Sequence, residues 1–382
     1  MKLLHTADWH LGRYLHGQSL LEDQEHVLGQ LISLAQREQV DIVLIAGDVY
    51  DRSVPPAEAV ALLDGILSHL VVECNIPVIL IAGNHDSAER IGFGSRVCNA
   101  RGLHLRGTLD DLSPVVLEDE HGEIAFFPLP YAEPIFARTL PGGEHITDHQ
   151  SAMSHIAGLL RAQIKLGQRS VLVGHTFVTG GSESDSERPI TVGGSGMVST
   201  DTFAGFDFVA LGHLHRPQTF ADRIHYAGSL LKYSFNEVDQ PKSVSIIEID
   251  AAGTPRIDRR PLSHLHDVRI ISGTLAELLQ HPDPARSKED YLCALLTDTD
   301  PLLEPMARLR EVYPNMMELQ FARQVMELAP GQAAVNHRSR NPDELFKSFF
   351  RDIAGEDISA PQLAVFNDVA TSLAKDDVRV AK

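Results

Sequence analysis

The chain has 382 residues, 33 of them basic and 52 acidic, so its formal net charge is −19. This length predicts one main domain with one or two smaller units, and 43% hydrophobic residues is ordinary for a globular protein. The charge argues against a protein that is held on nucleic acid or on a membrane by its own diffuse positive field. It leaves open a protein that reaches phosphates through bound metal ions.

Membrane insertion and export are not indicated. No run of about 18 apolar residues occurs that could cross a bilayer. The first residues, MKLLHTADWH, include a histidine and an aspartate before any apolar run that is long enough for a signal peptide. The cysteines are few, odd in number and scattered, which is typical of reduced thiols: Cys74, Cys98 and Cys293. We therefore expect a cytoplasmic protein without membrane association.

The first part of the chain alternates short apolar runs with amphipathic stretches, which is the pattern of an α/β domain. DIVLIA and PVILIA are uninterrupted and rich in β-branched residues, so they are predicted to be buried strands. A proline pair at a helix start is tolerated, because those backbone positions have no helical partner. The predicted order is a strand at 2–6, a helix at about 20–39, a strand at 41–46, a helix from 55 to about 72, and a strand at 77–82.

The middle of the chain contains consecutive strands, so the sheet is not expected to be wholly parallel. A segment rich in glycine, serine and acidic residues, 179–196, is predicted to be a loop. The strands predicted on either side of it lie at 123–128, 170–173, 206–211, 220–226 and 243–249.

The pattern of predicted strands and helices changes after about residue 251. Strands at 267–272, 291–297 and 316–321 alternate with helices at 275–280 and 305–312, which predicts a small α+β unit. A polar stretch and two amphipathic segments, 343–353 and 361–374, follow it. The predicted organisation is a main domain at 1–251, a smaller domain at 252–328, a linker at 329–341 and a helical tail at 342–382.

Five of the apolar runs each end in residues that can bind metal ions, and this regularity is the main functional signal. In α/β sheets, ligand sites gather beyond the carboxyl ends of the strands. Each motif alone fits an ordinary turn, a helix cap or a core histidine, but five such coincidences in order are improbable. The residues are Asp8 and His10, then Asp48, then Asn84, His85 and Asp86, then His175, and finally His213 and His215.

The chemistry of these side chains favours a pair of divalent metal ions. Carboxylate, imidazole and amide oxygen suit Mn, Fe or Zn, while the absence of thiolates argues against a structural zinc site. One aspartate with two oxygens can bridge ions about 3.5–4 Å apart. Such a pair stabilises both the attacking and the leaving oxygen of a phosphoryl displacement and lowers the pKa of a bound water.

The order D-x-H, GD, GNHD, GH and GHxH resembles the calcineurin-like metallophosphoesterase superfamily. Within it, LHTADWHLG, IAGDVYD, IAGNHDS, VGHTFVTG and ALGHLHRPQ, with YAGSLLKYSFNE after them, are similar to the SbcD family of bacterial DNA-repair nuclease subunits. The motifs cover about residues 1–250. The implied fold is an α/β domain of two packed mixed sheets flanked by helices, with a smaller α+β capping domain and a helical C-terminal tail.

The resemblance also implies the roles of the site residues. Two divalent metal ions, with Mn²⁺ the first expectation, would be bound at adjacent sites, and Asp48 would bridge them. His85 would not bind metal but would face the scissile phosphate, where it can donate a proton or stabilise charge. The remaining ligands would be Asp8, His10 and His215 for one ion and Asn84, His175 and His213 for the other.

The partners that the resemblance implies are DNA, a second nuclease subunit and a coiled-coil ATPase of the SbcC type. The expected activities are ATP-dependent exonuclease on double-strand ends and endonuclease on single strands and hairpins. A net charge of −19 is unfavourable for a solitary DNA enzyme, and a partner with a DNA-binding surface would resolve this. Two apolar stripes in the tail could lie on a partner's helices or on this chain's own domain: Leu345, Phe346, Phe349, Phe350 and Ile353, then Leu363, Phe366, Ala370 and Leu373.

Other residues and functions stay open at this level. Trp9 could face the site or form a wedge behind the ligands, and His5 is expected in the core. A phosphodiesterase or phosphatase of the same superfamily is the alternative enzyme, although GDVYDRSVPP lacks the arginine–glycine ending of the protein-phosphatase motif. A mainly architectural subunit is the third possibility. Four arginines beside the motifs could contact phosphates or be solvated: Arg13, Arg52, Arg90 and Arg216.

Overall fold

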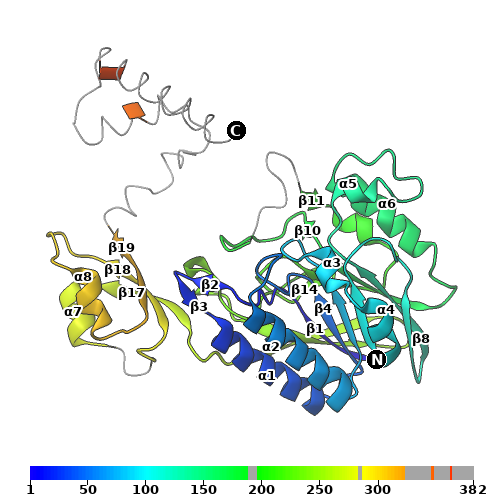
Figure 1. The fold of residues 1–382 in the computed structure, drawn as a ribbon, viewed down its shortest axis with the longest axis horizontal. Coiled ribbons are helices and arrows are strands. Elements are labelled where there is room, and N and C mark those ends of the chain that lie inside the picture. Colours follow the sequence, from blue (N-terminus) through cyan, green and yellow to red (C-terminus); the bar gives the residue numbers. More distant parts are fainter. Residues whose placement is uncertain (188–195, 283–285, 323–345, 348–361, 364–382) are drawn as a thin grey trace. The chain divides into compact units, whose positions relative to one another are not determined.

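The computed structural model describes residues 1–187, 196–282, 286–322, 346–347 and 362–363 (Figure 1). The chain divides into two compact units, 1–319 and 320–382, and nearly all of the described residues belong to the first. The predicted linker, 329–341, and nearly all of the predicted tail helices lie outside the described residues. None of the described helices is both long and apolar enough to cross a membrane.

The first of two six-stranded sheets has the order β16–β15–β1–β4–β5–β6. Strands β1, β4, β5 and β6 run parallel, and β15 and β16 are antiparallel additions at one edge. The bounds are β1 Lys2–Thr6, β4 Ile42–Ala46, β5 Val78–Ile81, β6 Leu103–Arg106, β15 Ser243–Ile249 and β16 Pro255–Pro261. The parallel order brings the carboxyl ends of β1, β4 and β5 to one edge.

The second six-stranded sheet has the order β13–β14–β12–β9–β8–β7. Its four central strands are parallel, and an antiparallel strand closes each edge. The bounds are β7 Val115–Asp119, β8 Gly122–Leu129, β9 Arg169–His175, β12 Phe208–Gly212, β13 Gln218–Phe220 and β14 Ile224–Tyr226. In this register Gly212 pairs with His175, so β9 and β12 end side by side.

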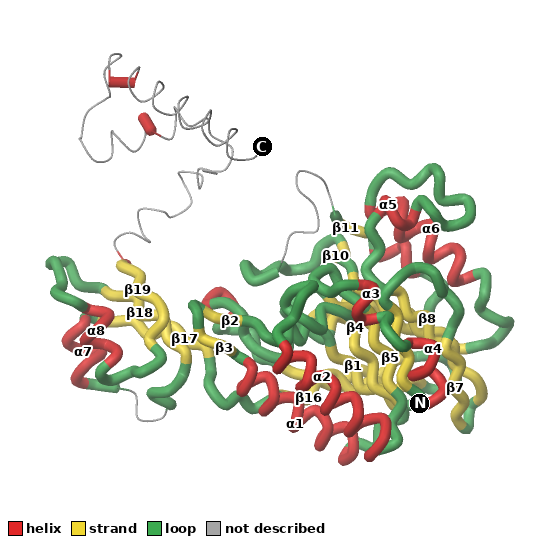
Figure 2. Tube along the Cα trace, viewed as in Figure 1, coloured by secondary structure: helices red, strands yellow, loops and turns green. Residues whose placement is uncertain are grey.

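The two sheets pack face to face between helices. Along β4, Ile42 and Leu44 point towards the second sheet, while Val43 and Ile45 belong to the cluster that includes the helices α1 and α2. This alternation explains the uninterrupted apolar runs, because both faces of each strand are buried. Helices α1 Leu21–Arg37 and α2 Ala57–Ser68 cover the first sheet, and α6 His149–Arg161 covers the second (Figures 1 and 2).

The remaining elements of this domain are short. They include two small pairs of strands, β2 with β3 and β10 with β11. Their bounds, with those of the short helices and helical turns, are β2 Tyr14–Leu15, β3 Gln18–Ser19, β10 Phe177–Val178, β11 Met197–Val198, α3 Ala88–Ile91, α4 Ser95–Cys98, α5 Pro134–Ala137, a π-helical turn at His69–Glu73, and 3₁₀ turns at Asn99–Arg101, Thr200–Phe203 and Phe235–Glu237.

A three-stranded sheet with two helices follows β16. Its strand order is β17–β18–β19, and β17 runs parallel to β18. Helix α7 begins with a capping box in which Thr274 and Glu277 bond each other's backbone amides. The bounds are β17 Val268–Gly273, α7 Leu275–Gln280, β18 Tyr291–Leu296, α8 Pro305–Arg310 and β19 Met316–Phe321. This part, residues 262–321, is called the capping unit below.

The structure confirms the predicted α/β class with two mixed sheets, and the predicted strands and helices lie close to the observed bounds. The single strand predicted at 220–226 is wrong. Ala221 and Asp222 have φ values of +47° and +57°, so the chain turns tightly between β13 and β14, which form an antiparallel hairpin. Helix α6 and the edge strands β6, β7 and β16 have no counterpart among the predicted elements.

A buried arginine links the start of β9 to the end of β7. Both guanidinium nitrogens of Arg169 pair with the Asp119 carboxylate, with 3.1 Å from Nη1 to Oδ2, and Nη2 also donates to the carbonyl oxygen of Gly122 at 2.8 Å. The hydrogen bonds from Arg169 hold the pKa of Asp119 well below its usual range. The ion pair therefore contributes stability above the ordinary carboxylate pKa of about 4, and this contribution is lost as the pH falls towards the lower folded-state pKa.

We expect Asp119→Asn to lower the free energy of unfolding at pH 7 by about 2 kcal/mol, because Arg169 would stay buried without its anionic partner. The difference from the wild type should shrink below pH 4, which urea titrations at pH 7, 5 and 3 would measure. The control is Glu120→Gln on the exposed neighbouring residue, expected within about 0.5 kcal/mol of the wild type. A pH-independent difference would contradict the electrostatic explanation.

Candidate metal centre

The loops after β1 and β4 leave the sheet side by side. The amide of Asp8 donates to the carbonyl oxygen of Gly47 at 3.0 Å, and the amide of His10 donates to that of Asp48 at 3.0 Å. Asp8, His10 and Asp48 have φ values of +54°, +45° and +49°. These left-handed conformations are unusual for side chains larger than glycine, and they typically persist where surrounding contacts impose them.

The loop after β5 is fixed to its neighbour by a buried carboxylate. Asp86 accepts hydrogen bonds from the amides of Gly83 at 2.8 Å, Tyr50 at 2.9 Å and Val49 at 3.1 Å. Burial raises the pKa of Asp86 to about 6, against the effect of these three amides. Asp86 therefore organises the turn that carries Asn84 and His85, a role that its motif alone does not reveal.

Strands β9 and β12 of the second sheet bring three histidines to the same place. His175 ends β9, and His213 and His215 follow β12. The amide of His213 donates to both carboxylate oxygens of Asp8, at 3.0 and 3.1 Å. The ends of strands from both sheets therefore meet, and every predicted site residue lies in this cluster.

Two groups of donor atoms stand out. Asp8, His10 and His215 offer ligand atoms that all lie within 4.8 Å of one another, and all three side chains are buried. The two Nε2 atoms of His10 and His215 are 3.1 Å apart. This is the first of the two sets that the resemblance implied.

The second group consists of Asp48, His175 and His213, again within 4.8 Å and buried. The Oδ1 atom of Asn84 lies 2.9 Å from His175 Nε2 and 3.2 Å from His213 Nδ1. Asp48 Oδ2 is 3.5 Å from His175 Nε2 and 3.8 Å from His10 Nε2. Asp48 therefore lies between the two groups, where a bridging carboxylate would be.

His85 lies at the rim of the cluster. Its Nδ1 is 2.8 Å from the carbonyl oxygen of Asp51, and its Nε2 is 3.9 Å from Asp48 Oδ2. Its side chain is 13% exposed, whereas those of His10, His175 and His215 are at most 1% exposed. His10, Asp51 and His85 form a third group of close donor atoms, in which Asp51 has no counterpart among the predicted site residues.

Burial decides the charge of most of these imidazoles. It lowers the pKa of His10 and of His215, and it lowers that of His213 to about 3, so all three are neutral at neutral pH. His175 is the exception, because attraction to the Asp48 carboxylate outweighs burial and raises its pKa to about 9. Burial also raises the pKa of Asp8 well above its usual value.

The tautomer of His215 follows from its neighbours. Ser186 Oγ donates to the carboxylate of Glu237, so the Ser186 oxygen can only accept from His215 Nδ1, 2.7 Å away. His215 therefore carries its proton on Nδ1 and directs the lone pair of Nε2 at His10. A metal-binding histidine is commonly oriented in this way by a hydrogen bond at its other nitrogen.

These contacts fit cations. His10 Nε2 faces a lone pair of His215, and His10 Nδ1 is buried without a hydrogen-bond partner among the described residues. The Oδ1 atom of Asn84 is a further acceptor, which lies between His175 and His213. An unpartnered buried nitrogen is costly in the absence of a ligand, and these carboxylate, imidazole and amide donors suit divalent ions.

Besides Ser186, three residues that support His215 are absent from the predicted site. Glu237 forms a buried ion pair with Lys242 at 2.6 Å, and Lys242 donates to the carbonyl oxygen of His215 at 3.0 Å. The carboxylate of Glu187 accepts from the amide of His215 at 2.6 Å. Glu237 ends the quoted string YAGSLLKYSFNE, but no local pattern connects it to a histidine 22 residues earlier.

The structure answers the question left open for Trp9. It is fully buried in the cluster between the first sheet and its helices, and its Nε1 donates to Thr6 Oγ1 at 2.9 Å, so it lies behind the ligands. His5 is a core residue, as expected. Arg13 pairs with Asp51 at 3.1 Å, whereas the other three arginines beside the motifs are exposed: Arg52, Arg90 and Arg216.

Comparison with known proteins adds a family to this geometry. Residues 1–217 match the family described as calcineurin-like phosphoesterase. The chain belongs to this family. The fold therefore implies a metal-dependent phosphoesterase with a binuclear divalent-metal centre, and the ligand-type clusters agree with it. Residues 264–353 match a second family, described as type 5 capsule protein repressor C-terminal domain.

Similarity to curated proteins extends over nearly the whole chain. A protein named as the D subunit of nuclease SbcCD, from Staphylococcus epidermidis, is 33% identical over 95% of this chain and 96% of its own. Its namesake from Staphylococcus saprophyticus subsp. saprophyticus is 34% identical over 98% and 99%. These matches confirm the resemblance to the SbcD family. A crystal structure of a dimetal phosphatase from Danio rerio aligns with a TM-score of 0.41 and 15% identity over 69% of this chain and 96% of that one, too distant to add to the argument.

We expect Gly83→Ala to damage the centre, because the added Cβ would overlap the carboxylate and the amide nitrogen of Asp48. The variant should bind divalent metal at least tenfold more weakly and lose about 1–3 kcal/mol of stability. Isothermal titration with Mn²⁺ and urea unfolding would measure both. The control is Gly65→Ala in α2, where a Cβ meets no atom within 4 Å, so metal binding should be unchanged and the helix slightly stabilised. Normal metal affinity in Gly83→Ala would contradict the close approach.

Proposed function

We propose that this chain is the nuclease subunit of a complex that processes DNA double-strand ends and hairpins by hydrolysing phosphodiesters with two divalent metal ions. The observation that carries the proposal is the convergence of two groups of ligand-type side chains on Asp48. The relatives named as the D subunit of nuclease SbcCD support DNA as the substrate, because their similarity covers nearly the whole chain and not the phosphoesterase domain alone.

In this proposal Asp48 would help to hold both ions. Mn²⁺ suits the mixture of carboxylate, imidazole and amide donors, in which thiolates are absent from the predicted set. When bound, the ions would supply Lewis-acid stabilisation of the phosphodiester and of the attacking water. The proposed ligands are Asp8, His10 and His215 for one ion and Asn84, His175 and His213 for the other.

His85 is the proposed catalytic residue of the protein itself. The carbonyl oxygen of Asp51 accepts from Nδ1 of His85, so Nε2 is the nitrogen that remains to hold or transfer a proton. Nε2 lies on the side of Asp48, at the rim of the ligand cluster and not in its interior. A histidine in that position can donate a proton to a departing oxygen or stabilise its negative charge.

A cleft beside the ligands offers room for substrate. It has a volume of about 560 Å³ and is bordered by Asn84, Tyr131 and Phe136. The Phe136 side chain is 61% exposed and can stack on a nucleobase. Acidic side chains also line the cleft, so it suits a base and its sugar better than a run of phosphates: Asp86, Glu89, Asp110 and Glu133.

The net charge of −19 supports a partner that supplies the DNA-binding surface. We propose that the partner is an SbcC-type coiled-coil ATPase, bound through the C-terminal tail, and that two nuclease subunits assemble with it in the cytoplasm. The proposed domains are the nuclease domain, predicted at 1–251 and extended here to 261 because β16 pairs with β15, then the capping domain up to 328, the linker at 329–341 and the partner-binding tail at 342–382. The family match at 264–353 includes most of the capping domain, the whole linker and the first part of the tail.

The decisive experiment is digestion of end-labelled duplex DNA with Mn²⁺, Mg²⁺ or chelator. We expect metal-dependent cleavage that falls by about 10²- to 10⁴-fold in His85→Gln, because the proton-transferring nitrogen is removed. His121→Gln, at an exposed histidine in the turn between β7 and β8, is the matched control and should cleave normally.

Full cleavage by His85→Gln would contradict the assigned role. Metal-dependent hydrolysis of a small phosphodiester, without DNA cleavage even when the ATPase and ATP are added, would favour the alternative phosphodiesterase.

A second prediction concerns the tail. Replacing Phe346 and Phe350 with serine should weaken binding of the ATPase subunit at least tenfold, because both belong to the first apolar stripe. Replacing their neighbours Lys347 and Arg351 with serine is the matched control. Surface plasmon resonance with the purified ATPase would measure both, and hydrolysis of a small phosphodiester should be unchanged. Equal effects of the two pairs would contradict docking through the stripe.

A further inference from the structure

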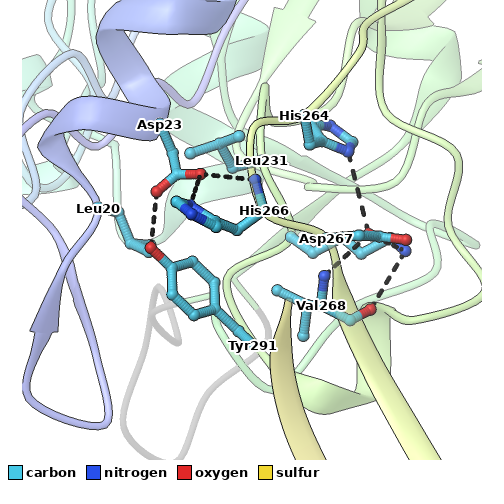
Figure 3. A pocket seen from close by; sticks show the side chains of 9 residues that line it. Leu20, Asp23, Leu231, His264, His266, Asp267, Val268 and Tyr291 are labelled. Atoms are coloured by element: carbon cyan, nitrogen blue, oxygen red, sulfur yellow. Dashed lines mark hydrogen bonds and ion pairs between the residues drawn. The ribbon is translucent and has the colours of Figure 1, made fainter. Parts of the chain in front are cut away.

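A buried carboxylate on α1 fastens the main domain to the capping unit (Figure 3). Asp23 Oδ1 accepts from the amide and from Nδ1 of His266, at 3.1 and 3.0 Å, and Oδ2 accepts from the hydroxyl of Tyr291 at 2.7 Å. His266 lies just before β17, and Tyr291 opens β18. Asp23 is 1% exposed, so its charge is stabilised by these donors and not by water.

A second attachment lies next to the first. Lys232 Nζ donates to Asp267 Oδ1 at 2.8 Å and to the carbonyl oxygen of Val268 at 3.4 Å. The Lys232 side chain is 10% exposed, which strengthens this ion pair relative to one at the surface. Both attachments line the same small pocket at the start of the capping unit.

The next residue on α1, Gln24, holds the loop that carries His10. Its Nε2 donates to the carbonyl oxygens of Trp9 and His10, at 3.0 and 2.8 Å, and its Oε1 accepts from the amide of Gly12 at 3.0 Å. Gln24 is fully buried. Without this side chain, two carbonyls and one amide of the loop would be left without these bonds in a water-free interior.

The residue after Lys232 repeats this arrangement. The hydroxyl of Tyr233 donates to the carbonyl oxygen of Trp9, and its ring lies edge-on to those of His10 and His215, with centroids 5.4 and 5.6 Å away. Two pairs of consecutive residues thus share one design. One member of each pair binds the capping unit, and the other binds the backbone of the loop that carries His10.

This loop needs such support. Asp8 and His10 have left-handed backbone conformations, with φ values of +54° and +45°. Conformations of this kind are strained and persist only where surrounding contacts impose them. Gln24 and Tyr233 together bind backbone groups of Trp9, His10 and Gly12. These groups lie on both sides of His10 along the chain.

We propose that Gln24 and Tyr233 are positioning residues for His10, and that the capping unit keeps them in place through Asp23 and Lys232. The proposal rests on the assignment of His10 as a metal ligand in the proposed function. A displacement of the capping unit would therefore shift the His10 loop through α1 and through the segment 232–233. The capping unit thus influences the affinity of the centre for its metal ions.

Tyr291→Phe tests this coupling, because it removes a single hydrogen bond to Asp23 and leaves every metal ligand in place. Tyr313→Phe is the matched control, since Tyr313 is also a buried phenol of the capping unit but donates to the carbonyl oxygen of Leu278 at 2.9 Å. Full-length proteins would be compared by isothermal titration with Mn²⁺, hydrogen exchange of the Gly12 amide and urea unfolding.

We expect Tyr291→Phe to weaken Mn²⁺ binding about three- to tenfold and to speed exchange of the Gly12 amide. Tyr313→Phe should lose similar stability without either effect. Gln24→Leu should weaken Mn²⁺ binding about 10- to 100-fold and alter the electron paramagnetic resonance spectrum of bound Mn²⁺. Adding Tyr291→Phe to Gln24→Leu should have no further effect on affinity, because the connection is already broken.

Equal Mn²⁺ affinity in the wild type, Tyr291→Phe and Tyr313→Phe would overturn the coupling, as would additive effects in the double variant. Should Gln24→Leu fail to fold, Tyr291→Phe with Lys232→Met decides the question through the same titration. A wild type that binds no Mn²⁺ would overturn the proposed function and this inference with it. Two bound ions with unaffected variants would overturn the inference alone.

Discussion

The carboxylate of Asp8 joins the two sheets at the point where their strands end. Asp8 belongs to the loop after β1 of the first sheet, and both of its oxygens accept from the amide of His213, which follows β12 of the second. The inner faces of the sheets pack through apolar side chains such as Leu44 and Val173. Apolar packing has no directional preference, so this polar contact aligns the strand ends and brings histidines from one sheet to carboxylates of the other.

That alignment produces a costly arrangement, which the surroundings compensate. Imidazoles and carboxylates are buried close together, and the Nδ1 atom of His10 has no hydrogen-bond partner among the described residues, which divalent cations at this site would compensate. The protein fixes the orientation of each donor from behind, as the carbonyl oxygen of Ala46 does for His175 at 2.9 Å and Ser186 does for His215. The buried pair of Glu237 and Lys242 balances its own charge, so this support adds no net charge to the centre.

The sequence predicts which side chains come together here, because the motif residues directly follow strands. Apolar runs locate β1, β4, β5, β9 and β12, and parallel strands place their carboxyl ends together within each sheet. The contact between Asp8 and His213, which joins the two sheets, does not follow from these runs. The sequence does not predict the roles of Asp23, Gln24 and Glu237, because their hydrogen-bond partners are distant along the chain. Gln24 donates to a carbonyl oxygen 14 residues earlier, and Asp23 accepts from Tyr291, 268 residues later. No periodicity encodes such pairs. The hairpin at 218–226 was missed for a different reason. Alanine seldom adopts the left-handed conformation that this turn requires at Ala221, so the sequence gives no turn signal there.

The net charge of −19 and the buried centre have opposite effects on phosphates, which the charge repels and a metal-loaded centre would attract. Acidic residues keep phosphates away from most of the surface, which leaves the strand ends as the place where bound cations can attract them. A DNA substrate held only at the strand ends would be bound weakly, because about half to two-thirds of the hydrogen bonds in protein–DNA complexes go to the phosphates and sugars of the DNA. In the proposed function, productive binding therefore depends on a second DNA-binding surface that the partner supplies. Because the capping unit contacts α1 and α1 holds the His10 loop, a partner that binds the capping unit would, in the proposed function, both present DNA and adjust the metal centre.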